Sequence, residues 1–241
     1  MILLPALNPS EWTGPTGNNT YLFPGNPSIL IDAGVGHADH VDAIARALDG
    51  SSLNLVLLTH GHNDHAAGVP ALVARWPGVQ VRGGAPGRLH DGDAFENSGV
   101  RLSALYTPGH APDHFCFVDT QSRDIYCGDL ARAGGTITIP ASTGGNLREY
   151  LDSLRLIKAM NPPRLLPAHG VVIDHPQLVL DEYLAHRAQR EKQVRAALSA
   201  GHTTPDEIVA WIYPRLSTAL HAAARESVLA HLAKIREDDE M

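Results

Sequence analysis

Three imidazoles and one carboxylate lie within six consecutive positions of the run Thr59-His60-Gly61-His62-Asn63-Asp64-His65. Imidazole nitrogen and carboxylate oxygen are ligands that suit zinc and neighbouring metals. His60 and His62 are two residues apart, so in an extended segment they point to the same side. Asp64 and His65 follow at a predicted turn and can approach from another direction. This arrangement fits two metal ions better than one, and a polar loop rich in histidine is the alternative.

Three further polar clusters follow strand-like apolar runs, as the histidine run does. They are Thr107-Pro108-Gly109-His110, Gly128-Asp129 and Pro167-Ala168-His169-Gly170. In open α/β sheets, sites form outside the carboxyl ends of strands, so clusters at four strand ends can meet in one place. The candidate metal ligands are then His60, His62, Asp64, His65, His110, Asp129 and His169. Two ions that share one bridging carboxylate and one bridging hydroxide would use this whole set.

The elements that must position these clusters alternate between strand-like and helix-like runs. Strands are predicted at 20–23, 28–31, 53–58, 79–81, 100–106, 114–118, 124–127 and 165–166, and helices at 39–48, 69–76 and 147–160. The first two strands are predicted to be adjacent because the turn Pro24-Gly25-Asn26-Pro27 joins them. This pattern predicts an α/β fold with a mixed sheet.

From about residue 181 onward the pattern becomes helical only. The predicted helices cover 183–200, a segment capped by Thr204 and Glu207, and 217–237. The last helix carries an apolar stripe with Val228, Leu232 and Ile235, which needs a partner surface. We therefore expect the tail to pack on the rest of the chain and to shape the pocket or a dimer contact. The predicted division is a larger domain at 1–181, which carries every candidate ligand, and a helical tail domain at 182–241.

The composition is that of a folded protein without a strong attraction to nucleic acid. Hydrophobic residues make up 44% of the 241 residues, and 19 Lys plus Arg against 26 Asp plus Glu give a net charge of −7. Cys116 and Cys127 are interpreted as small core residues. The amino terminus lacks a basic region followed by an apolar run, and no stretch approaches the ~18 apolar residues of a membrane span. We expect a cytoplasmic protein with no membrane partner.

The complete set of motifs resembles the metallo-β-lactamase superfamily, in particular the glyoxalase II type and the lactamase-beta-2-like branch. The resemblance rests on the His-x-His-x-Asp-His run at 60–65, His110 in Thr-Pro-Gly-His, Asp129 in Gly-Asp, His169 in Ala-His-Gly, and Gly17-Asn18-Asn19-Thr20-Tyr21. It implies an αββα sandwich with a C-terminal helical, winged-helix-like tail. It further implies that one metal is held by His60, His62 and His110, the other by Asp64, His65 and His169, with Asp129 bridging.

Other polar residues are expected to support the ligands or to be structural. Asp32 matches an aspartate that supports the ligands in this family, although an aspartate in a strand-end turn is a comparable interpretation. His114 is expected at most to support a ligand, while His202 and His221 are expected to be structural or exposed. The basic run of Arg187, Arg190, Lys192 and Arg195 is interpreted as a solvated helix face, with phosphate binding as the alternative. A β-wing has little room before Met241.

The resemblance implies a hydrolase with two zinc ions, and iron or manganese are alternatives because imidazole and carboxylate accept all three. Two metals can lower the pKa of a bridging water toward neutrality, which makes the resulting hydroxide the expected nucleophile. The expected catalytic carboxylates are Asp64, as proton acceptor, and Asp129. Our leading hypothesis is cleavage of a small acyl substrate, a thioester, lactone or β-lactam. The alternatives are a phosphodiesterase acting on single-stranded RNA and a non-catalytic or redox metal protein. We also expect that the tail can form a homodimer contact.

Overall fold

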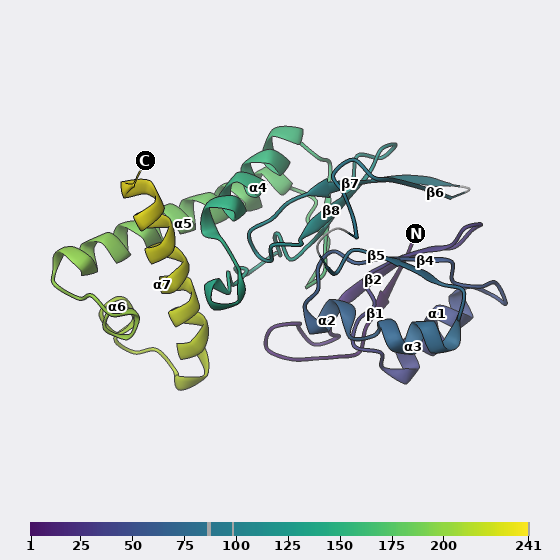
Figure 1. The fold of residues 1–241 in the computed structure, drawn as a ribbon, viewed down its shortest axis with the longest axis horizontal. Helices are drawn as coiled ribbons and strands as arrows, with labels where there is room; N and C mark the ends of the chain where they lie inside the picture. The colour runs from purple at the N-terminus through teal and green to yellow at the C-terminus, as the bar shows by residue number, and fades with distance from the viewer. Residues whose placement is uncertain (86–87, 98, 241) are drawn as a thin grey trace.

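The protein folds as two five-stranded sheets stacked face to face, with helices on their outer faces (Figure 1). This architecture is seen in a computed structural model, which describes residues 1–85, 88–97 and 99–240. The αββα sandwich and the helical tail that the sequence predicts are therefore confirmed.

The first sheet is mixed, as predicted. Its strands are β1 (Ile2–Pro5), β2 (Asn19–Phe23), β3 (Ile29–Ile31), β4 (Leu55–Leu57) and β5 (Gln80–Arg82), in that order. β2 pairs with β3 in antiparallel fashion, whereas β3, β4 and β5 are parallel. The outer face is covered by α1 (Ala38–Ala47) and α3 (Val69–Arg75), where Leu30 and Val56 pack with Ile44 and Leu72. The sequence did not predict β1, a partly exposed edge strand that lacks a long apolar pattern.

The second sheet has the order β10-β9-β8-β7-β6. These strands are β6 (Ala94–Asn97), β7 (Val100–Tyr106), β8 (Phe115–Asp119), β9 (Ile125–Gly128) and β10 (Leu165–Pro167). Two helices, α4 (Leu147–Met160) and α5 (Pro176–Ser199), cover its outer face, where Ile125 and Leu165 pack with Leu154 and Tyr183. Cys116 and Cys127 are buried free thiols in this core, as predicted. The edge strand β6 was again missed by the sequence patterns.

The inner core between the sheets explains why most strands lack polar alternation. Tyr21 and Phe23 project from the first sheet onto Tyr126 of the second, at ring-centroid distances of 5.0 and 5.4 Å. Leu22, between them in the sequence, packs on the opposite face against the helices. A strand covered on both faces must be apolar at nearly every position. The two sheets are therefore held together over their inner faces.

The tail consists of the end of α5 together with α6 (Pro205–Ile212) and α7 (Thr218–Asp239). Thr204 and Glu207 form the predicted capping box at the start of α6. The stripe of Val228, Leu232 and Ile235 is buried in the tail's own core, whereas we expect from the sequence that it faces the larger domain. It packs inside the tail, because Val194, Ala197, Ile208 and Val209 of α5 and α6 supply its partner surface. Residues 176–240, which the structure describes throughout, contain no strand and therefore no β-wing.

A different face of α7 joins the tail to the larger domain. Ala230 enters the core formed by α4 and α5, and Glu226 accepts a hydrogen bond from the Ser142 backbone N–H at 2.9 Å. Arg148 of α4 forms ion pairs with Glu237 and Asp238. The division at residue 181 falls within the continuous helix α5, and we keep it as a proposal. Among the described residues, no helix combines the length and apolar content that a transmembrane span requires.

Arg187 departs from the predicted solvated helix face. It is only 3% exposed, it donates to the Ile137 carbonyl, and its guanidinium lies 5.6 Å from the centre of the Tyr150 ring. The prediction is wrong at this residue because α5 is covered on two sides, by the larger domain and by α7. Lys192 and Arg195 remain partly exposed.

Candidate metal centre

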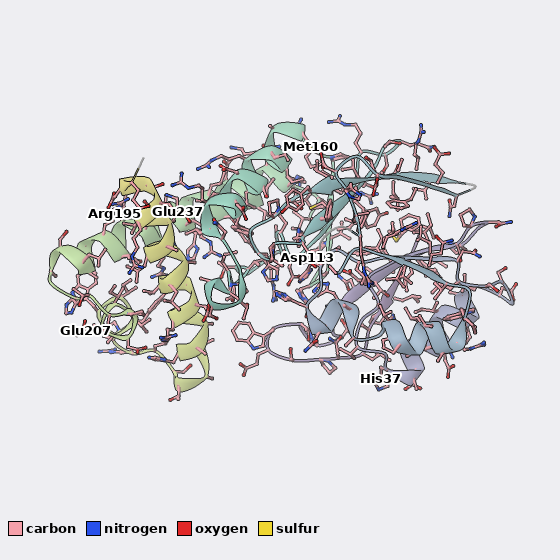
Figure 2. The ribbon with its side chains drawn as sticks, viewed as in Figure 1. His37, Asp113, Met160, Arg195, Glu207 and Glu237 are labelled. Carbon is pink, nitrogen blue, oxygen red and sulfur yellow. The ribbon has the colours of Figure 1, made fainter. Side chains whose placement is uncertain are left out.

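The seven predicted ligands converge at one end of the sandwich, from loops that follow strands of both sheets. His60 and His62 follow β4, and His110, Asp129 and His169 follow β7, β9 and β10. Asp64 and His65 lie on the short helix α2 (Asn63–Ala66), which replaces the predicted turn. Its first turn is closed by a hydrogen bond from the His65 N–H to the His62 carbonyl at 3.0 Å. Asp113, which flanks Gly61, marks this region at the centre of Figure 2.

Close packing behind the loop that carries His110 requires a glycine. Gly109 has φ of +127°, a conformation that residues with a Cβ rarely adopt. A Cβ at this position would lie 2.2 Å from the Tyr150 backbone nitrogen at the start of α4. The loop therefore rests directly on α4, and this contact fixes where His110 can point.

A first group of ligand atoms comes from three histidines. His62 Nδ1 lies 2.9 Å from His60 Nε2 and 3.0 Å from His110 Nε2. Imidazole nitrogens around one tetrahedral zinc at about 2.0–2.1 Å stand about 3.3 Å apart, close to this spacing. Burial, followed by the charges of His65 and His110, holds the pKa of His60 well below its ordinary value. A neutral ring keeps the lone pair that binding a cation requires.

A second group contains one carboxylate and two histidines. Asp64 Oδ2 lies 3.4 Å from His65 Nε2 and 3.5 Å from His169 Nε2. Burial alone would raise the pKa of Asp64, but the hydrogen bond and charge of His65 lower it to about 2. The carboxylate is therefore ionised at neutral pH and offers a negatively charged ligand.

The two oxygens of Asp129 divide between these groups. Oδ1 lies 3.0 Å from His169 Nε2 and 3.6 Å from His65 Nε2, whereas Oδ2 lies 3.3 Å from His110 Nε2. Burial would raise the pKa of Asp129, but His65 and His169 hold it well below the ordinary value. An ionised carboxylate with one oxygen toward each group has the geometry of a bridging ligand.

The donor set fits divalent metal ions. Among the described residues, Asp129 Oδ1 and His169 Nδ1 are buried without a hydrogen-bond partner. Leaving a buried carboxylate oxygen unpaired is costly unless a cation compensates it. Three overlapping sets of ligand atoms, His60–His62–His110, His60–His65–Asp129 and Asp64–His65–His169, each lie within 4.8 Å of one another. Imidazole and carboxylate ligands suit zinc, iron and manganese.

Asp32 supports the site through His65, as the resemblance implies. Its Oδ2 accepts a hydrogen bond from His65 Nδ1 at 2.9 Å, and its Oδ1 accepts one from the Thr59 backbone N–H at 2.8 Å. Burial would lower the pKa of His65, but the Asp32 and Asp129 carboxylates raise it well above the ordinary value. The Nδ1–H bond to Asp32 directs Nε2 toward Asp64 and Asp129. Asp32 also occupies a strand-end turn, with φ of +62°.

Two consecutive asparagines of the motif at 17–21, Asn18 and Asn19, also support the site. Asn18 Nδ2 donates to Asp64 Oδ2 at 3.1 Å. The backbone N–H of Asn19 donates to the Ala168 carbonyl at 2.7 Å, and its side chain donates to the carbonyls of Pro167 and Gly170. These bonds join β2 to the loop that carries His169. The available signal was two consecutive amides at the start of an apolar strand, because buried amides need partners.

His114 supports Asp129 from behind. Its Nε2 accepts a hydrogen bond from the Asp129 backbone N–H at 3.2 Å, and its Nδ1–H donates to the Thr107 carbonyl at 3.0 Å. Burial, followed by the charge of His110, lowers the pKa of His114 to about 3. A neutral ring is what these two hydrogen bonds require.

His202 lies in the tail beside Trp211, with 6.1 Å between the ring centroids.

Known proteins are similar to this chain in sequence and in fold. The profile of the metallo-beta-lactamase superfamily matches residues 13–88 and 80–169, and that of the beta-lactamase associated winged helix domain matches 204–240. Lactamase-like protein aptB of Emericella nidulans is 32% identical over 241 residues, which cover 92% of this chain and 76% of that protein. The atrochrysone carboxyl ACP thioesterase of Aspergillus chevalieri is 37% identical over 191 residues, covering 76% of this chain and 60% of that protein. A beta-lactamase domain protein from Burkholderia ambifaria superimposes with a TM-score of 0.80 at 20% identity, over 99% of this chain and 86% of that chain.

Proposed function

Because this chain belongs to the metallo-β-lactamase superfamily, we propose that it is a hydrolase that uses two divalent metal ions to cleave a small acyl substrate. The observation that carries this proposal is the position of Asp129, whose two oxygens face two different groups of histidines. A site for a single ion would not need a buried carboxylate shared in this way. We propose zinc as the ion, with iron and manganese as alternatives.

In this proposal, His60, His62 and His110 hold one ion, Asp64, His65 and His169 hold the other, and Asp129 bridges them. Two such ions lower the pKa of a water molecule toward neutrality and polarise the acyl carbonyl. The protein itself supplies the group that accepts the proton. Asp64, with a side chain 32% exposed against 10% for Asp129, is the carboxylate best placed to accept the proton of the attacking water.

We propose a thioester as the substrate class, with lactones and β-lactams as alternatives. The support is the relative named atrochrysone carboxyl ACP thioesterase, although this chain spans 60% of that protein's length. The reaction consumes water and breaks the bond between the acyl carbon and sulfur, so the products are a carboxylic acid and a thiol. A formal net charge of −7 disfavours RNA as a competing substrate, because phosphates attract basic surfaces.

A hydrolysis screen with metal analysis tests the proposal. Purified protein should carry about two metal ions per chain, and it should cleave thioesters faster than lactones, β-lactams or single-stranded RNA. His62→Ala should abolish the hydrolysis, which excludes a contaminating enzyme. One ion or none per chain in protein purified without chelators would reject the dinuclear site.

Salt dependence separates the acyl hydrolase from the nuclease. Cleavage of RNA driven by phosphate contacts weakens steeply with added salt, whereas hydrolysis of a small neutral thioester responds little. RNA cleavage that is salt-sensitive and lost in His62→Ala, without any acyl hydrolysis, would establish the nuclease instead.

A further inference from the structure

A cavity of about 260 Å³ lies where the tail meets the larger domain. Trp12 and residues 136–138 line it from the larger domain, and the tail contributes His186, Arg187, Arg190, Tyr213, Leu216 and Leu220, among others. The Thr138 carbonyl accepts a hydrogen bond from His110 Nδ1 at 2.8 Å. One wall of the cavity therefore adjoins the backbone that orients a proposed metal ligand.

Two guanidinium groups line this cavity, and the described residues give neither of them a counter-charge. Arg187 is 3% exposed, and Arg190 lies over the Tyr213 ring, 4.4 Å from its centre. Their hydrogen bonds go to neutral acceptors, the Ile137 carbonyl and Gln193 Oε1. In the part of the chain that the structure describes, neither arginine forms an ion pair with a carboxylate, whereas Arg195 on the same helix pairs with Glu191, Asp238 and Asp239.

Several donors at this cavity remain unused. Arg187 Nε, Arg190 Nε and His186 Nδ1 are buried atoms without a hydrogen-bond partner among the described residues. Burying a cation without a partner is unfavourable, so proteins seldom retain such a cluster without a ligand for it. The positive charge also acts on a neighbouring residue. Burial, followed by the charges of Arg187 and Arg190, lowers the pKa of His231 to about 3. These observations indicate that the cavity receives an anion.

The rim of the cavity is apolar. Trp12 is 52% exposed and Leu220 is 45% exposed, and both line the opening. Trp12 also lines an adjoining cavity of about 340 Å³ together with Ala222 and Ala223 of α7. Exposed large apolar side chains beside a polar pocket are typical of ligand sites. The part of the ligand that carries the anionic group is therefore apolar, and a flat apolar group would stack on Trp12.

We propose that this cavity binds a carboxylate carried by the acyl substrate, with Arg187 and Arg190 on the acid group and Trp12 on the apolar body. A carboxylate carries one negative charge, so it is less costly to bury behind an apolar rim than a phosphate dianion. This assignment rests on the proposed acyl hydrolase. It makes the tail part of substrate selection, because both arginines belong to α5 and the rim includes residues of α7 and of the loop before it.

The test compares two thioesters that differ only in charge. A 4-carboxybenzoyl thioester and its methyl ester have the same acyl body, and kcat and KM are measured for both. Arg190→Gln removes a guanidinium that is half-buried, whereas Arg187→Gln also breaks the bond to Ile137 and could unfold the protein. Arg195→Gln is the matched control, since it removes the same charge from α5 at a residue that is labelled in Figure 2, pairs with Asp238 and is not among the residues that line the cavity.

We expect Arg190→Gln to raise KM for the carboxylate substrate by about 10-fold, the loss typical of a charged hydrogen bond. Its kcat, and both constants for the methyl ester, should change little, and Arg195→Gln should behave as wild type. An equal change for both thioesters, or no change, would overturn the assignment while leaving the hydrolase intact.

Direct binding separates this inference from the proposed function. Monomethyl terephthalate, which carries one carboxylate, is titrated calorimetrically against wild type and both variants, so no catalysis is needed. Binding that is lost in Arg190→Gln and kept in Arg195→Gln supports the carboxylate site even if no thioester is cleaved. No binding to the wild type, or binding of a single-stranded oligonucleotide in its place, rejects it.

Discussion

Replacing Asp32 with asparagine should change which nitrogen of His65 carries the proton. The substitution turns one carboxylate oxygen into an NH₂ group and keeps the shape of the side chain. The NH₂ cannot face the Thr59 backbone N–H, because two donors would meet at the present 2.8 Å and a backbone amide cannot become an acceptor. It must therefore face His65 Nδ1, now 2.9 Å from Oδ2, and this nitrogen then has to give up its hydrogen.

The proton of a neutral His65 then moves to Nε2, the nitrogen that points toward Asp64 and Asp129. A protonated nitrogen has no lone pair for a metal ion, so the ring must rearrange before it can bind one. Changing a residue that orients a metal-binding histidine typically lowers affinity by about 10- to 100-fold. That loss equals about 1.4–2.7 kcal/mol. It should be confined to the ion that His65 helps to hold.

Competition with a chromophoric zinc chelator measures this loss. The variant should release one ion at a chelator concentration at least about 10-fold lower than wild type requires. The ion proposed to be held by His60, His62 and His110 should stay bound. Asp124→Asn is the matched control, because Asp124 is also a buried aspartate but pairs with Arg164 at the other end of β9. Release of both ions at the wild-type chelator concentration would refute the tautomer argument. Equal weakening of both ions would refute the separation into two groups.

Three further outcomes follow from the same geometry. Asp129→Asn should release both ions in the chelator assay, and two ions retained with wild-type affinity would exclude a bridging role. Gly109→Ala should lower the thermal unfolding temperature, since its Cβ would collide with the Tyr150 backbone, and an unchanged temperature would show that the loop can move away. The pKa of His231 falls from 6.5 to about 3 on folding, so below pH 6.5 the unfolded chain binds a proton that the folded chain does not. This residue should therefore lower the free energy of unfolding by about 1.4 kcal/mol per pH unit of acidification below 6.5. In urea unfolding near neutral pH and at about pH 5, His231→Gln should lose less stability on acidification than wild type.

The parts of the fold that could be predicted from the sequence are those whose pattern is local. The capping box at Thr204 is complete within four positions, and the strands β3 and β4 are apolar at every residue. The edge strands β1 and β6 could not be found in this way, because each has only four residues and is partly exposed, so neither carries a sustained apolar pattern. The stripe on α7 was recognised, but its partner was misjudged, since helical periodicity shows that a face is buried without showing against what.

The candidate ligands could be predicted because each belongs to a short polar cluster that contains glycine and follows an apolar run. The residues that orient them could not be assigned with the same ease. Asn18 reaches Asp64 across 46 positions of sequence, and His114 supports the backbone of Asp129 across 15. Such contacts depend on the order of strands within each sheet, because β2 lies two strands from β4 in the first sheet and β8 pairs with β9 in the second. Arg187 shows the same limitation, because a basic residue on a helix looks solvated until the packing of α7 is known.

The division of the candidate ligands between the two sheets has a consequence for biosynthesis. Neither group of ligand atoms is complete within one sheet, because the loop after β4 supplies part of each and the second sheet supplies His110 or His169. A nascent chain that has exposed His65 still lacks His169, which is synthesised 104 residues later (169 minus 65). At translation rates of about 5–20 residues per second, this interval lasts about 5–20 s. During that time the histidine run is a loose, incomplete chelator, so full metal loading must wait until the second sheet has been made.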